Sequence, residues 1–70
     1  METKQWPNSK QIISTSYEET LAELTVKFKT GIYAYQNVPV IKWEALRKAD
    51  SIGKFINTDI KPHYSVIKIS

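Results

Sequence analysis

The sequence predicts a single α+β domain in which a three-stranded antiparallel β-meander, over residues 9–37, is followed by two short helices packed on one of its faces. Three observations support this prediction. Apolar and polar residues alternate over residues 22–28, a glycine at position 31 separates this segment from a second β-rich segment, and the apolar spacing changes to three and four after Pro39. The chain has 70 residues, which is enough for one hydrophobic core.

The first eight residues are expected to form an N-terminal tail, and the domain itself to span residues 9–70. Residues 1–8 have no sustained apolar period, and Pro7-Asn8 is a turn-type pair. Trp6 is the side chain that would pin this tail to the domain. Residues 9–17 contain three large apolar side chains among Ser and Thr, which indicates the first strand: Ile12, Ile13 and Tyr17.

The second and third strands are expected to form a hairpin. Residues 22–28 alternate as a half-buried strand does, and residues 33–35 resume a β-rich pattern after Thr30-Gly31, where glycine can take a positive φ. With a two-residue loop at Thr30-Gly31, Tyr33 and Tyr35 lie on the buried face of the sheet. A three-residue loop would place both tyrosines on the opposite face, and the sequence leaves this choice open.

Two helices are expected after Val38. Pro39 suits the first position of a helix over about residues 39–48, whose apolar side chains recur every three residues: Trp43, Leu46 and Ala49. Asp50 or Ser51 caps a second helix, which Pro62 ends and whose apolar positions are Ile52, Phe55, Ile56 and Ile60. Residues 64–69 either return as a short C-terminal strand or lie along the sheet edge.

Composition excludes several classes of protein. No segment approaches the roughly 18 uncharged residues of a membrane-spanning helix, and no secretory signal follows the first residues, so a cytoplasmic protein without membrane contact is expected. The chain has no cysteine and one histidine, His63, which argues against disulfides, a metal site and nucleophilic catalysis. We therefore expect no cofactor and no enzymatic activity.

The net charge of +3 lies entirely in the second half of the chain, because residues 1–35 hold four Lys and four Glu. A basic surface suits a polyanionic partner. Tyr33 and Tyr35 share one face of a strand beside Lys27 and Lys29, so their rings could stack unpaired bases while the lysines contact phosphates. The structural alternative is that both tyrosines are core residues.

A second candidate site lies at the start of the second helix, in Ser51-Ile52-Gly53-Lys54. Free backbone N–H groups there attract anions, glycine permits close approach of a ligand, and Lys54 adds charge. Asn57 follows about one turn later. The structural alternative is a capping serine and a glycine that allows close helix packing.

The order of these residues resembles the KTSC domain family, which occurs at the C-terminus of some bacterial lysyl-tRNA synthetases and as a stand-alone bacterial or phage protein. The resemblance rests on residues spread over about three quarters of the chain: Tyr17, Leu24, Val26, Phe28, Gly31, Tyr33, Tyr35, Val38, Pro39, Trp43, Leu46, Ser51, Gly53, Phe55, Asn57, Ile60 and Tyr64. It implies a small domain with no assigned activity that binds RNA, by association with a tRNA-charging enzyme.

The leading hypothesis for function is therefore a small non-enzymatic module that binds nucleic acid, with RNA or another single strand as the favoured partner. It would use Tyr33, Tyr35, Lys27 and Lys29, or the helix start at Ser51 with the nearby lysines. The alternative hypothesis is a protein-interaction module without a nucleic-acid ligand, either a homodimer or a small phage-encoded inhibitor or adaptor that presents an apolar patch.

Overall fold

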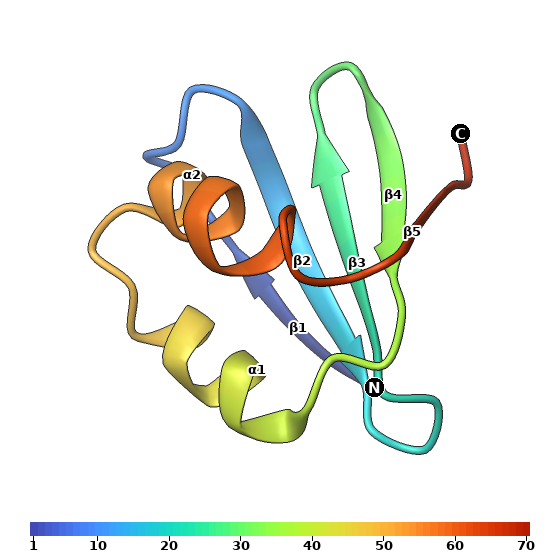
Figure 1. Cartoon of the computed structure of the whole chain (residues 1–70). Coiled ribbons are helices and arrows are strands. Elements are labelled where there is room, and N and C mark those ends of the chain that lie inside the picture. Colours follow the sequence, from blue (N-terminus) through green and yellow to red (C-terminus); the bar gives the residue numbers. More distant parts are fainter.

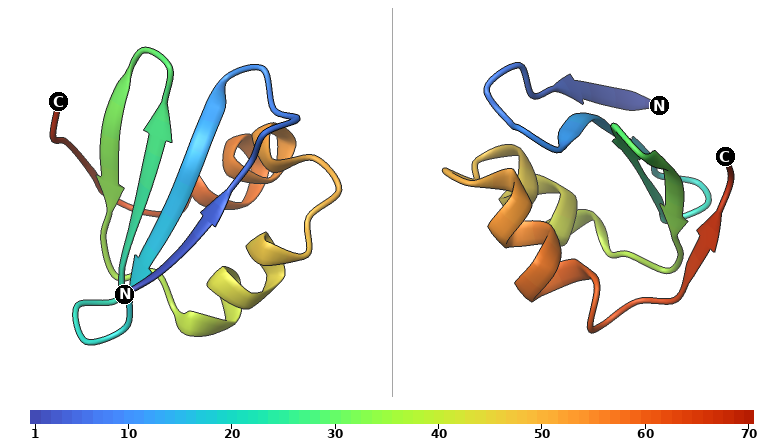
Figure 2. Two further views of the ribbon diagram at one scale, coloured as in Figure 1. Left: turned by 180° about the vertical axis from the view of Figure 1, so that it is seen from behind. Right: turned by 90° about the horizontal axis from the view of Figure 1, so that it is seen from above.

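Five antiparallel strands form one sheet in the order β1-β2-β3-β4-β5, and the helices cover one of its faces (Figure 1). The structure is a computed structural model that describes all residues, 1–70. Its elements, in chain order, are β1 (Glu2–Gln5), β2 (Ile12–Glu18), β3 (Glu23–Phe28), β4 (Gly31–Tyr35), α1 (Val40–Arg47), α2 (Ile52–Phe55), the π-helical turn η1 (Ile56–Ile60) and β5 (Val66–Lys68). Figure 2 shows that the opposite face of the sheet carries no helix.

The α+β class and the two helices are confirmed, but the expected number of three strands is wrong, because β1 and β5 extend the meander on either side. The C-terminal strand that the sequence left open is present as β5, and it pairs with β4. Residues 2–5, which were expected to lie in a tail, form β1 and pair with β2 from Glu2↔Tyr17 to Gln5↔Ser14. This edge strand is polar throughout, so it has no apolar alternation for a sequence pattern to detect.

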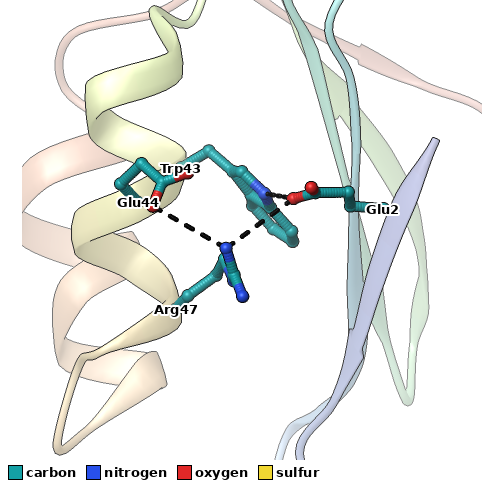
Figure 3. Close-up of polar contacts among 4 residues, drawn as sticks. All are labelled: Glu2, Trp43, Glu44 and Arg47. Atoms are coloured by element: carbon teal, nitrogen blue, oxygen red, sulfur yellow. Dashed lines mark hydrogen bonds and ion pairs between the residues drawn. The ribbon is translucent and has the colours of Figure 1, made fainter.

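Two tryptophans hold β1 in place. The Trp6 indole N–H donates a 2.9 Å hydrogen bond to the buried Thr15 hydroxyl, as suits the anchoring role expected for Trp6. Trp43, from α1, donates its Nε1–H to the Glu2 carboxylate at 2.5 Å (Figure 3). Arg47 lies 3.9 Å from the same carboxylate, but both side chains are largely exposed, so this ion pair contributes little to stability. The hydrogen bond from a buried indole is the main link between β1 and α1.

The loop of the hairpin between β3 and β4 lies one residue earlier than expected, which shifts the pairing of the two strands by two residues. Phe28 pairs with Gly31, so the two-residue loop is Lys29-Thr30 rather than Thr30-Gly31. A shift of two residues preserves the face on which each side chain lies. Tyr33 lies opposite Val26, and Tyr35 lies opposite the buried Leu24. Both tyrosines therefore project from the helix-covered face.

Gly31 does not use the positive φ that the sequence suggested. Glycine is required for a different reason: a Cβ at this position would lie 2.8 Å from the main-chain oxygen of Ser70, just after β5. That oxygen accepts a 2.9 Å hydrogen bond from the Ile32 N–H. The close approach of the C-terminal segment to β4 therefore depends on the absence of a side chain at position 31.

The core lies between the sheet and the helices. Tyr17 and Trp43 stack there with ring centroids 5.7 Å apart, and the Tyr17 hydroxyl donates a 2.7 Å hydrogen bond to the Val38 carbonyl. The apolar positions expected on both helices are largely confirmed, since these side chains are buried: Trp43, Leu46, Ile52, Ile56 and Ile60. No helix of this chain is both long enough and apolar enough to cross a membrane.

Candidate nucleic-acid interface

A cleft of about 470 Å³ opens on the helix-covered side, between the β3–β4 hairpin, the end of η1 and β5. We call it the Tyr33 cleft. Seven residues line it: Gln11, Phe28, Thr30, Tyr33, Tyr35, Lys61 and Val66. Its volume lies within the range of about 300–1,000 Å³ that is usual for small-ligand sites. These residues come from four separate parts of the chain, and the hairpin register and the position of β5 bring them together.

Two aromatic rings form one wall of the cleft. Phe28 and Tyr33 meet edge to face, with centroids 5.6 Å apart and planes 80° from parallel. Each ring packs against the core on one side and is partly exposed on the other. Because core packing holds the rings, the cleft presents a fixed aromatic surface on which a flat ligand can stack.

A cation lies beside this wall. The Lys61 ammonium is 5.5 Å from the centroid of the Phe28 ring, which is within cation–π range. Lys61 forms no ion pair, since the two salt bridges of the molecule both belong to Arg47. The aromatic wall and an unneutralised ammonium group therefore adjoin, as recognition of a stacked base and its phosphate requires.

Tyr35 supplies the floor of the cleft. Its side chain is only 3% exposed, so neither face of its ring is open to a ligand. Burial, and then the neighbouring Tyr33, raise the pKa of the Tyr35 phenol above its ordinary value, so the hydroxyl stays protonated at all physiological pH values. The expected pair of stacking tyrosines thus reduces to Tyr33, and Tyr35 is the core residue of the structural alternative.

Comparison with known proteins assigns the chain to a family. The KTSC domain family matches residues 8–64. The chain belongs to the KTSC domain family. A KTSC domain protein from Yersinia pestis, solved as a crystal structure, matches with a TM-score of 0.90 and 27% identity over 99% of this chain and 97% of that one. A comparison with curated proteins gives no match.

The lysines expected beside the tyrosines divide between two places in this KTSC domain. Lys27 alternates with the core residues of β3 and projects from the face without helices, so it does not meet the cleft. Lys29 lies in the hairpin loop, where its N–H donates a 2.9 Å hydrogen bond to the carbonyl of Gln11, a cleft residue. Of the four residues predicted on this strand pair, Tyr33 and Tyr35 therefore line the cleft, and Lys29 adjoins it through its main-chain hydrogen bond.

At the second predicted site, the start of α2, a structural role accounts for Ser51 but not for Gly53. Ser51 accepts a 3.4 Å hydrogen bond from the Lys54 N–H, which is the capping role of the structural alternative. Gly53 is not required for close packing, because a Cβ there would meet no atom within 4 Å. Lys54 and Asn57 are exposed and outside the Tyr33 cleft. α2 is a single four-residue turn, too short for its N-terminus to carry an anion site unaided.

Five residues of the cleft lay outside the predicted site: Gln11, Phe28, Thr30, Lys61 and Val66. Phe28 lies on the same face of β3 as the buried Leu24 and Val26, so the sequence pattern indicates a core position and gives no sign that its ring is partly exposed. Lys61 lies far from Tyr33 in the sequence, and only the fold brings it to the aromatic wall. No three His, Asp or Glu side chains gather anywhere in the domain in a way that would hold a metal ion.

Proposed function

We propose that this KTSC domain is a non-enzymatic module that binds single-stranded RNA in the Tyr33 cleft. The observation that supports the proposal is the partly exposed wall of Phe28 and Tyr33 beside the unpaired Lys61 ammonium. An unpaired base stacks on Tyr33, and the flanking phosphates contact Lys61 and Lys29. The net charge of +3 favours association with any polyanion, so the aromatic wall is what selects a single strand.

The proposal is tested with a fluorescently labelled uridine dodecamer, whose anisotropy is followed at 50 and 250 mM salt. Stacking on one ring is worth about 1–3 kcal/mol per base, so Tyr33→Ala should weaken binding by about tenfold or more. Lys61→Ala should weaken binding and lower its salt dependence. Lys48→Ala is the matched control, because it removes the same charge from an exposed position beside β1, at the other edge of the sheet.

Two results would contradict the proposal. The first is absence of binding by the unaltered protein at 50 mM salt. The second is an equal loss of affinity in Lys48→Ala and Lys61→Ala with none in Tyr33→Ala, which would mean that the net charge alone attracts RNA. Circular dichroism of each variant verifies that the fold is retained.

A second candidate function, self-association, is favoured by the free edge of β5. Three side chains at this edge are about half exposed: Val66 (47%), Ile67 (52%) and Ile69 (57%). Ser65 and Ile69 exchange backbone hydrogen bonds with the β4 side. Backbone groups alternate in direction along a strand, so the N–H and C=O groups of Val66 and Lys68 point away from the sheet. An antiparallel strand can pair there.

A second copy of the chain fits this edge by symmetry. With a twofold axis at Ile67, the outward-facing Val66 of one copy pairs with Lys68 of the other, and the two Ile67 side chains meet at a close, non-hydrogen-bonded position. No two lysines are directly opposed in this register. The contact is confined to one short strand, so it falls below the area of a stable dimer and the association is weak.

Sedimentation at protein concentrations from 10 to 500 µM tests self-association. The average mass should rise with concentration and rise further at high salt, because salt screens the repulsion between two basic copies. Ile67→Lys should remain monomeric, whereas Ile41→Lys, at an exposed position on α1, should behave as the unaltered protein does. A constant monomer mass at 500 µM and high salt would exclude this candidate.

A further inference from the structure

We infer that the Tyr35 hydroxyl, at the floor of the Tyr33 cleft, donates a hydrogen bond to the carbonyl oxygen of a single unpaired base, so that the cleft takes uracil, guanine or cytosine in preference to adenine. This inference rests on the proposed RNA-binding function and names the chemistry that the cleft recognises. Its basis is a comparison of two buried tyrosines and the hydrogen-bonding groups of the cleft.

Tyr17 and Tyr35 are buried to almost the same extent, with 4% and 3% exposure, but their hydroxyl groups differ. The Tyr17 hydroxyl donates to the Val38 carbonyl at 2.7 Å. The Tyr35 hydroxyl has no partner among the side-chain hydrogen bonds of the domain. Buried polar groups are nearly always hydrogen-bonded, so an unpaired hydroxyl on a buried ring calls for an explanation.

The Tyr35 hydroxyl is still accessible from the cleft. No buried polar side-chain atom of the domain lacks a partner, so this unpaired oxygen keeps some contact with solvent. Tyr35 lines the Tyr33 cleft, and its ring is otherwise enclosed by the core. The small exposed part of the side chain is thus directed into the cleft, where a ligand can reach it.

The cleft offers hydrogen-bond donors beside its aromatic wall. Lys61 can only donate hydrogen bonds and a protonated phenol donates readily, whereas Gln11 and Thr30 can both donate and accept. A matching ligand is planar, carries an acceptor on its edge and has a negative charge nearby. A nucleotide with an exocyclic carbonyl has all three features. Adenine is the one common base without such a carbonyl, because its edge presents an amino donor and ring nitrogens.

The test uses short strands in which every residue is abasic except one, so that a single base can occupy the cleft. Strands with one uracil, one adenine or no base are titrated against the unaltered protein, Tyr35→Phe and Tyr17→Phe. We expect uracil to bind about three- to tenfold tighter than adenine, as one hydrogen bond allows. Tyr35→Phe should abolish this preference without lowering the unfolding temperature, because the hydroxyl has no partner in the protein.

Tyr17→Phe is the matched control. It removes a buried hydroxyl that does have a partner, so it should lower the unfolding temperature and leave the preference for uracil intact. Equal binding of the uracil and adenine strands by the unaltered protein would overturn the inference, as would a preference that survives in Tyr35→Phe. In both cases binding of the uridine dodecamer would still stand. If the unaltered protein did not bind the uridine dodecamer at all, the proposed function itself would be refuted.

Discussion

The two glycines of the chain provide a matched pair of substitutions with opposite expected effects. Gly31→Ala places a Cβ 2.8 Å from the main-chain oxygen of Ser70, so the C-terminal segment must move away from β4. The movement breaks the hydrogen bond that this oxygen accepts from the Ile32 N–H. Crowding of a backbone atom and loss of one hydrogen bond together cost about 1–2 kcal/mol.

Gly53→Ala should stabilise the protein. A Cβ at position 53 meets no atom within 4 Å, and the residue lies inside α2, where alanine is favoured over glycine by about 0.5–1 kcal/mol. For a domain of this size, each kcal/mol corresponds to about 4–8 °C in the unfolding temperature. We expect Gly31→Ala to unfold below the unaltered protein and Gly53→Ala above it.

Thermal unfolding followed by circular dichroism measures both effects. Hydrogen exchange of the Ile32 amide adds local information, because it should become faster in Gly31→Ala and stay unchanged in Gly53→Ala. The explanation of the two glycines is refuted if Gly31→Ala leaves both the unfolding temperature and this amide unaffected. It is equally refuted if Gly53→Ala lowers the unfolding temperature.

Three further predictions concern polar contacts outside the cleft. Tyr17→Phe should lower the free energy of unfolding by about 1–2 kcal/mol in urea titrations, because it leaves a buried carbonyl without its donor. Glu2→Gln keeps an acceptor for Trp43 and should leave the β1 amides protected from hydrogen exchange, whereas Glu2→Ala should expose them. The hydrogen bonds from Thr20 lower the pKa of Glu18. The stability that they contribute is therefore present above the unfolded-state pKa of Glu18 and is lost as the pH falls through its folded-state pKa. In NMR titrations, Thr20→Val should raise the pKa of Glu18.

Local patterns in the sequence predict the central elements well. The alternation over residues 22–28 reports burial on one face, and it corresponds to β3 because the helices cover only that face. The spacing of Ile52, Ile56 and Ile60 likewise predicts one buried stripe, although the second half of this helix winds as a π-helical turn. Such elements are predictable because burial of one face of a helix or strand produces the apolar period in the sequence.

Edges and sites depend on contacts that no local pattern contains. β1 is polar, and it is held by hydrogen bonds to Thr15 and from Trp43, far along the chain. The face occupied by the tyrosines depends on loop length, and a difference of one residue would reverse it. Lys27 and Lys29 share one side of the strand pattern, yet Lys27 projects from the helix-free face of β3 whereas Lys29 lies in the hairpin loop beside Gln11.

The two candidate functions draw on the same edge of the sheet and respond to salt in opposite ways. Val66 lines the Tyr33 cleft and also belongs to the free edge of β5. Salt weakens the contact of Lys61 with a phosphate, whereas it strengthens the approach of two basic chains. If both occur, pairing through Ile67 brings two Tyr33 clefts to adjacent positions in one continuous sheet. RNA long enough to span both clefts would then bind more tightly than a short strand, and Ile67→Lys would remove this difference while leaving the short strand unaffected.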